Sequence, residues 1–233
     1  MGAFQTTRWS LIIAARDDTP EARGALDALC RAYRPAVLTY VRGRGHSRGE
    51  AEDLTQGFFA RFLERGLHAS ADRERGRFRV YLRTALHNFL VNTYEHDAAE
   101  RRRPPQRPVD LDPDQLPTAA GDDLPERAFE RAWAVTVVQR AMQRLRREAR
   151  AAGKGELFTR LQGFLLEAPD GDDYPRIAAE LGMRANTIAV ATHRLRGRLR
   201  ELVREELADT VDRAEDVDDE YAALVGSMGP RRK

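Results

Sequence analysis

Arginine is the side chain with the clearest chemistry in this sequence. Thirty-seven of the 39 basic residues are arginines, and the only lysines are Lys154 and Lys233. The guanidinium group presents its donors in a planar fork that suits the phosphate oxygens and base edges of nucleic acids. Residues 73–103 carry eight arginines and four acidic residues, and residues 184–204 carry six arginines and one acidic residue. Two basic segments predict contact with nucleic acid at two separate places.

An acidic segment follows the second basic segment. Residues 205–220 carry nine acidic residues and one arginine, so the formal net charge of +2 hides a strong segregation along the chain. An acidic C-terminal tail either covers a basic surface as DNA would or keeps the protein soluble, and we expect the second role.

Patterns of catalysis and metal binding are missing from the sequence. The five histidines are scattered, and no glycine-rich phosphate loop or nucleophile elbow occurs. Cys30 is the only cysteine, which excludes an internal disulfide and a cysteine-rich zinc site. We predict a protein that is not an enzyme and uses no cofactor or metal. No apolar run approaches the roughly 18–20 residues of a membrane span, and no secretion signal is recognisable, which favours the cytoplasm.

The elements that position the basic side chains are predicted to be helices. No segment alternates apolar and polar residues long enough to form a strand, so the fold class is all-α. Thr19 as N-cap and Pro20 at the first helical position open a helix that ends before Pro35, which starts the next one. SRGE at residues 47–50 is a capping box that opens a further helix, and a long helix starts near Phe78.

A proline-rich stretch divides the chain. Residues 104–125 hold six of the eleven prolines, which is the composition of a linker. We therefore predict two helical domains. Residues 20–103 follow an N-terminal extension (1–19), and residues 126–207 precede the acidic C-terminal tail (208–233).

The most specific stretch lies in the second domain. YPRIAAEL at residues 174–181 predicts a short helix, Gly182 and Met183 a turn, and residues 186–207 a longer basic helix. A helix-turn-helix needs small residues where its helices cross, so we expect a bulky residue at Ala178 or Gly182 to force the helices apart. An ordinary helical hairpin is the alternative, but the AAELG spacing and the basic second helix favour DNA binding.

Three segments, in this order, resemble RNA polymerase sigma factors of the extracytoplasmic-function (ECF) type. AEDLTQGFF at residues 51–59 is similar to the family's A-E-D-L-x-Q-[DE]-x-F helix. FRVYL at 78–82, continuing to Asn88, is similar to F-x-x-W-L…N, and the helix-turn-helix is similar to I-A-x-x-L-G-x-x-x-x-T-V-K-S-R. The resemblance covers roughly residues 25–207. It implies a bacterial factor with a region 2-like bundle and a region 4-like helix-turn-helix, which binds core polymerase, recognises a promoter and opens the DNA.

The resemblance also implies site residues in both domains. Acceptors that would dock on the polymerase are Glu50, Glu52, Asp53 and Gln56. Residues that would bind the minus-ten element are Arg73, Arg75, Arg77, Arg79, Asn88 and Asn92. Residues that would bind the minus-thirty-five element are Arg184, Asn186, Thr187, Val190, His193, Arg194 and Arg196. The acids have a plainer interpretation as favourable charge at a helix N-terminus. Asparagine suits bidentate contact with base edges, whereas AVA at residues 189–191 replaces the family's K-S-R and predicts thin polar readout.

Thr55 is a candidate phosphorylation site. The family places Asp or Glu after Gln56, where this chain has Gly57, and a phosphate on Thr55 would add roughly −1.5 to −2 charge beside that gap. Alternatively, Thr55 packs its methyl group in the core. The expected partners are core RNA polymerase (the beta-prime clamp and beta flap), promoter DNA, and a Ser/Thr kinase or an anti-sigma factor.

Two other function classes fit parts of the sequence. A helix-turn-helix regulator that binds DNA without engaging polymerase would have no need of Asp53, Gln56 and the minus-ten segment. A helical hydrolase would need convergent histidine and carboxylate residues, and the sequence pattern provides none.

Overall fold

The computed structural model describes residues 19–64, 77–101, 124–211, 213 and 215–229. The predicted all-α fold is confirmed, since these residues form helices and the one β-bridge among them joins Arg77 to Val211. No helix within these ranges is long and apolar enough to cross a membrane. The chain divides into two compact units. Unit 1 holds residues up to Thr136 and from Ala208 onward, and unit 2 is Val137–Leu207.

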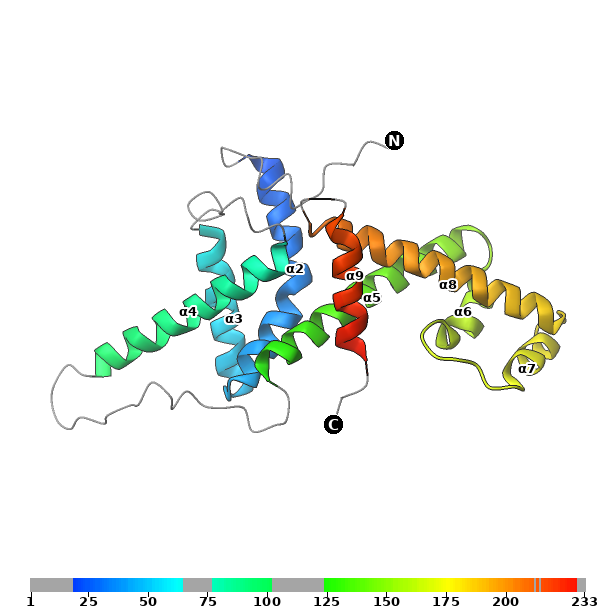
Figure 1. The fold of residues 1–233 in the computed structure, drawn as a ribbon, viewed down its shortest axis with the longest axis horizontal. Helices are drawn as coiled ribbons and strands as arrows, with labels where there is room; N and C mark the ends of the chain where they lie inside the picture. The colour runs from blue at the N-terminus through cyan, green and yellow to red at the C-terminus, as the bar shows by residue number, and fades with distance from the viewer. Residues whose placement is uncertain (1–18, 65–76, 102–123, 212, 214, 230–233) are drawn as a thin grey trace. The chain divides into compact units, whose positions relative to one another are not determined.

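Unit 1 contains the N-terminal helices and the C-terminal helix (Figure 1). Its helices are α2 (Pro20–Gly43), α3 (Arg48–Glu64), α4 (Phe78–Arg101), the first turns of α5 (Pro125–Ala151) and α9 (Asp216–Met228). α9 belongs to this unit although the whole of unit 2 lies between it and α4 in the sequence. The predicted acidic tail is therefore part of a folded unit, and the units do not coincide with the predicted ranges 20–103 and 126–207.

Aromatic side chains hold the helices of unit 1 together. The rings of Tyr33 on α2 and Phe78 on α4 meet edge to face, with their centroids 5.0 Å apart. Phe62 on α3 lies 5.7 Å from Tyr81 on α4, measured in the same way. Such pairs contribute about 0.5–1.5 kcal/mol each beyond the apolar area that they bury. The cluster fixes which faces of α3 and α4 remain exposed.

The start of α2 is confirmed, but its predicted end is wrong. The hydroxyl of Thr19 accepts a hydrogen bond of 3.2 Å from the backbone N–H of Ala22, as an N-cap does. The helix then continues through Pro35 to Gly43 as one element. Proline removes one backbone hydrogen bond. Pro35 lies on the exposed side of α2, where water can satisfy the carbonyl group that loses its partner.

Unit 2 consists of the rest of α5 and the elements that follow it. These are α6 (Gly155–Leu161), a 3-10 helix (Gln162–Leu165), α7 (Asp173–Glu180) and α8 (Ala185–Ala208). Its core includes Ile177 and Ile188, with Leu181 and Leu195 packed against them. These four apolar residues pack α7 against α8.

Gly182 forms the turn between α7 and α8 for a reason that differs from the predicted one. A Cβ atom at this position would meet no heavy atom within 4 Å, so the expected crowding is wrong for Gly182. Its φ angle of +65° lies in the left-handed region that residues with a side chain rarely adopt. The backbone of the turn, rather than the helix crossing, requires glycine.

Gly182→Ala is therefore expected to lower the free energy of unfolding of unit 2 by about 1–2 kcal/mol. Gly163→Ala is a matched control, since Gly163 also has open space around its Cβ position but has no positive φ angle. Urea unfolding followed by circular dichroism measures both variants. Equal effects of the two substitutions would show that the backbone of the turn is not the constraint.

Candidate functional site

The first turn of α3 carries the predicted capping box. The backbone N–H of Ser47 donates to Glu50 Oε2 at 2.9 Å, and the N–H of Glu50 donates to Ser47 Oγ at 3.4 Å. Hydrogen bonding to Ser47 holds the pKa of the Glu50 carboxyl below its usual value. The carboxylate of Glu50 therefore caps the helix, which is the plainer interpretation of this acid.

The next acceptors on α3 differ in their surroundings. Glu52 is half-buried and accepts a charged hydrogen bond of 2.6 Å from Arg34 on α2. Asp53 and Gln56 are exposed and lie three residues apart, which places them side by side on the helix surface. Of the four predicted docking residues, Asp53 and Gln56 present acceptors to solvent most directly.

The exposed face of α4 presents two amides. Asn88 and Asn92 are both exposed and lie four residues apart, so their side chains are neighbours on one face of the helix. Each amide can donate and accept, which is the combination needed for a bidentate contact with adenine. The structure thus brings together the two predicted base-reading residues, whereas Arg73 and Arg75 lie outside the described residues.

Arg79, a predicted DNA contact, lies in the interior of unit 1, where its donors are bonded to carboxylates. It is 9% exposed, and its Nε and Nη2 donate to the two carboxylate oxygens of Glu220 on α9, at 3.0 and 2.9 Å. It also donates to Glu130 on α5, and its guanidinium lies 4.5 Å from the centre of the Trp133 ring. Burial opposes the charged form, but the two carboxylates outweigh it and raise the pKa of Arg79.

Arg77, the preceding predicted DNA contact, is also engaged by α9. Its guanidinium donates to Asp219 at 2.7 Å and lies 3.5 Å from Asp216. One residue further on, the backbone N–H of Phe78 donates to the carbonyl oxygen of Thr210 at 3.0 Å. The segment at the beginning of α4 is therefore covered by the C-terminal part of the chain.

Sequence reasoning missed the partners of these two arginines. Glu130 and Trp133 lie three residues apart on α5, and Glu220 is the last residue of the acidic run 218–220. Within a run of acidic residues, the residue type does not show which of them is buried. One available signal was the position of Glu220 four residues before Leu224, which places both on one face of a helix. Both residues are buried.

The first half of α8 presents the predicted minus-thirty-five residues on one face. Spacings of three, four and seven residues place Asn186, Val190 and His193 along a single stripe, and all three are exposed. Thr187 and Arg194 flank the stripe and are exposed as well. The same exposure is found for Arg184, at the turn before the helix. The structure therefore brings six of the seven residues together.

Arg196 is the exception, and its predicted role is corrected. Its Nε donates to the carbonyl oxygen of Phe164 at 2.9 Å, and its Nη2 donates to that of Glu167 at 2.8 Å. These bonds tie α8 to the end of the 3-10 helix. Arg198, near the middle of α8, is likewise held by Glu148 at 2.8 Å. Both arginines position elements of unit 2.

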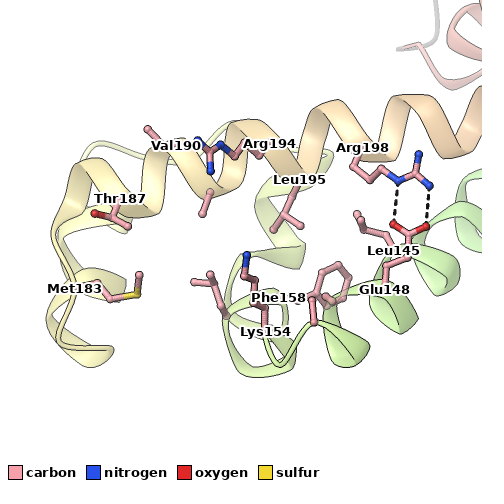
Figure 2. A pocket seen from close by; sticks show the side chains of 14 residues that line it. Leu145, Glu148, Lys154, Phe158, Met183, Thr187, Val190, Arg194, Leu195 and Arg198 are labelled. Atoms are coloured by element: carbon pink, nitrogen blue, oxygen red, sulfur yellow. Dashed lines mark hydrogen bonds and ion pairs between the residues drawn. The ribbon is translucent and has the colours of Figure 1, made fainter.

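An apolar groove lies beside the first half of α8 (Figure 2). Its volume is about 440 Å³, and most of its lining is apolar, from Leu145 on α5, Phe158 on α6 and Leu195 on α8. Val190 and Arg194 also border it, so the predicted DNA-contacting face adjoins the groove. The groove lies entirely within unit 2.

A comparison with protein families bears on the N-terminal part of the chain. Residues 29–99 match the family model described as Sigma-70 region 2. We refer to residues 29–99, which are similar to this family model, as the region 2 segment, or region 2. No curated protein and no solved structure matches the chain.

Region 2 holds the exposed acceptors of α3 and the exposed amides of α4. Asp53, Gln56, Asn88 and Asn92 all fall within the matched residues. α5, α9 and the whole of unit 2 lie outside them. The contacts of Arg79 thus join region 2 to two helices that are not part of the match.

Thr55 is a buried residue of region 2. Its side chain is 0% exposed, and its hydroxyl finds no hydrogen-bond partner among the described residues. A kinase cannot reach this hydroxyl while α3 is packed, so the burial counts against phosphorylation. The alternative, in which Thr55 packs its methyl group in the core, agrees with the structure.

A metal site requires several His, Cys, Asp or Glu side chains that lie close together. In the described parts of both units, His, Cys, Asp and Glu side chains do not gather in groups of three that could hold a metal ion. Cys30 is buried on α2, and burial raises the pKa of its thiol to about 12, which makes it a packing residue rather than a nucleophile.

Proposed function

We propose that this protein is a sigma factor of the ECF type, which binds core RNA polymerase, recognises two promoter elements and opens the promoter DNA. The observation that carries the proposal is the region 2 match over residues 29–99. It is supported by Asp53 and Gln56, which are exposed acceptors on the helix that docks on polymerase in the resembling family. The protein has no chemical step of its own in this role.

In this proposal, α3 docks on the beta-prime clamp of the polymerase. A basic partner surface would meet Asp53 and Gln56, while Phe58 and Phe62 on the opposite face anchor α3 in the core of unit 1. Opposite charges across such an interface steer the encounter and fix its register. The carboxylate of Glu52 contributes only after exchanging its contact with Arg34.

Promoter recognition is assigned to α4 and α8. Asn88 and Asn92 would read unpaired bases of the minus-ten element, because their exposed amides can contact base edges. Asn186, Thr187, Val190, His193 and Arg194 would face the minus-thirty-five element, with Val190 suited to a thymine methyl group.

The alternative is a helix-turn-helix regulator that binds DNA without polymerase. It would explain the exposed face of α8 but not a region 2 with exposed acceptors on α3. Binding to core polymerase separates the two functions directly. An anti-sigma partner stays a prediction.

Asp53→Ala is expected to weaken binding to core polymerase by about tenfold, because an exposed acid that faces a basic partner is lost. Glu64→Ala is the matched control, since Glu64 is also an exposed acid and lies at the other end of α3. A titration of fluorescently labelled protein with purified core polymerase gives both dissociation constants. An unchanged affinity of Asp53→Ala, or an equal loss for both variants, would contradict the docking surface. Failure of the wild-type chain to bind would reject the sigma-factor proposal.

A further inference from the structure

The acidic helix α9 binds the arginines at the beginning of α4. Arg77 donates to Asp219 at 2.7 Å, and Arg79 binds both carboxylate oxygens of Glu220. The contact extends to the backbone, because the N–H of Phe78 donates to Thr210, just before α9. α9 thus binds two successive arginines at the start of α4, and the segment between α8 and α9 is bonded to the backbone between them.

An arginine that is bonded to a carboxylate in this way is arranged as it would be on a phosphate. The planar guanidinium offers two parallel N–H groups, and carboxylate and phosphate oxygens accept them with the same geometry. Glu220 occupies two donors of Arg79 in the bidentate arrangement. A phosphate and Glu220 therefore cannot hold these donors at the same time.

The arginines lie on the part of the chain that the proposed function brings to single-stranded DNA. Arg77 and Arg79 precede Asn88 and Asn92 along the same region 2 segment. The first five residues of α9 include four acids, Asp216, Asp218, Asp219 and Glu220, which have a charge of the same sign as the DNA backbone. While α9 is docked, its carboxylates hold donors that a DNA phosphate would need.

We propose that α9 is an intramolecular competitor of single-stranded DNA, which occupies Arg77 and Arg79 and must leave before these arginines bind phosphates. The inference rests on the proposed function, since it concerns the minus-ten end of α4. By linkage, DNA weakens the docking of α9 by the same factor by which α9 weakens DNA binding.

Undocking of the whole helix α9 differs from removing one partner of the Arg79–Glu220 ion pair by mutation. When α9 leaves, Glu220 becomes hydrated and Arg79 exchanges a carboxylate for a phosphate, so neither charge is left buried and unpaired. The apolar anchor of α9 is Leu224, which is 3% exposed, whereas the neighbouring Val225 is 53% exposed. These two residues offer a matched pair of truncations on one helix.

The first test measures the affinity of the full chain for fluorescein-labelled single-stranded DNA of random sequence by anisotropy. Leu224→Ala is expected to tighten binding roughly tenfold, because it loosens the docked helix and raises the competent fraction. Val225→Ala is expected to leave the affinity within about twofold of the wild type. Equal affinities of the wild type and Leu224→Ala would overturn the proposal, provided that circular dichroism shows both to be folded.

A second pair of variants leaves the core of unit 1 untouched. Asp219→Asn removes an exposed acid that contacts Arg77, and Glu215→Gln removes an exposed acid that contacts Arg213 instead. Both remove one negative charge from the same segment, so the difference between them measures the contact with Arg77. We expect Asp219→Asn to bind DNA about two- to threefold tighter than Glu215→Gln. Equal affinities in this pair would contradict competition at Arg77.

Hydrogen exchange of the wild-type chain tests the displacement itself. Adding the same DNA is expected to speed exchange of the amides of α9, residues 216–228, while those of α2 stay protected. Unchanged protection of α9 at saturating DNA would overturn the inference. These outcomes differ from failure of the proposed function, which shows as absence of binding to core polymerase by wild type and variants alike.

Discussion

Replacing Arg79 by alanine is expected to lower the free energy of unfolding of unit 1 by about 3–5 kcal/mol. Glu220 is 0% exposed and has its bidentate partner in Arg79. Without this guanidinium, the buried carboxylate of Glu220 keeps only a longer contact of 3.6 Å with Arg77 and loses both of its close donors. The substitution also removes the cation that lies over the ring of Trp133, which adds about 0.5–2 kcal/mol.

Urea unfolding of Arg79→Ala is followed by the fluorescence of Trp133, in a Trp9→Phe background so that one tryptophan reports. Arg83→Ala is the matched control, because Arg83 contacts the same Glu130, at 3.0 Å, but is 37% exposed. We expect less than about 1 kcal/mol for this surface pair. A loss for Arg79→Ala no larger than that of the control would show that the buried ion pair is not a structural centre of unit 1.

The second large effect is expected at the exposed amides of α4. Alanine at both Asn88 and Asn92 is expected to impair promoter opening by at least about fivefold per residue, since a bidentate base contact contributes about 1–3 kcal/mol. Affinity for core polymerase should stay unchanged, because neither side chain lies on α3.

Permanganate footprinting of a promoter complex measures the opening in this double variant. Gln139→Ala is a suitable control, since it truncates an exposed amide on α5 and leaves α4 intact. Normal opening by the double variant would remove these residues from the proposed minus-ten contacts. If the double variant loses both core binding and promoter opening, the two asparagines support the fold rather than contact the DNA.

Local sequence signals predicted where α2 and α3 start and which faces of α7 and α8 are buried. Thr19 and the capping box at Ser47 and Glu50 are short-range features, because the groups that they bond lie three residues away. The inward direction of Ile177 and Ile188 follows from helical periodicity in the same way. The continuous α2 was missed because proline is common at the first position of a helix, which made Pro35 look like a helix start. The sequence alone does not show that Pro35 lies on the exposed side of a longer helix.

The roles of the arginines could not be read from local patterns. Arg79 meets Glu220 across 141 residues of sequence and Glu130 across 51, and Arg196 meets the carbonyl of Phe164 across 32. A basic residue in a basic segment has the same local pattern whether it contacts phosphate or an internal carboxylate. For this reason the residue types predicted nucleic-acid binding, while the fold decides which arginines are available for it.

The same distinction applies to the neutral site residues. Asn88, Asn92 and Val190 were assigned by resemblance, and their exposure follows from the helical faces on which they lie. Thr55 shows the limit of this reasoning, since it lies two residues from the exposed Asp53 and yet is completely buried. On a helix, residues two positions apart point in different directions.

Run-off transcription tests the sigma-factor proposal most directly. Purified core RNA polymerase is combined with genomic promoter fragments and either the wild-type chain or Leu224→Ala, because a docked α9 is expected to reduce transcription by the wild type. We expect discrete transcripts that depend on the added chain, that increase with Leu224→Ala, and that fall with Asp53→Ala. Binding of the chain to the DNA fragments without any transcript from either protein would contradict the account and favour a regulator that does not engage polymerase.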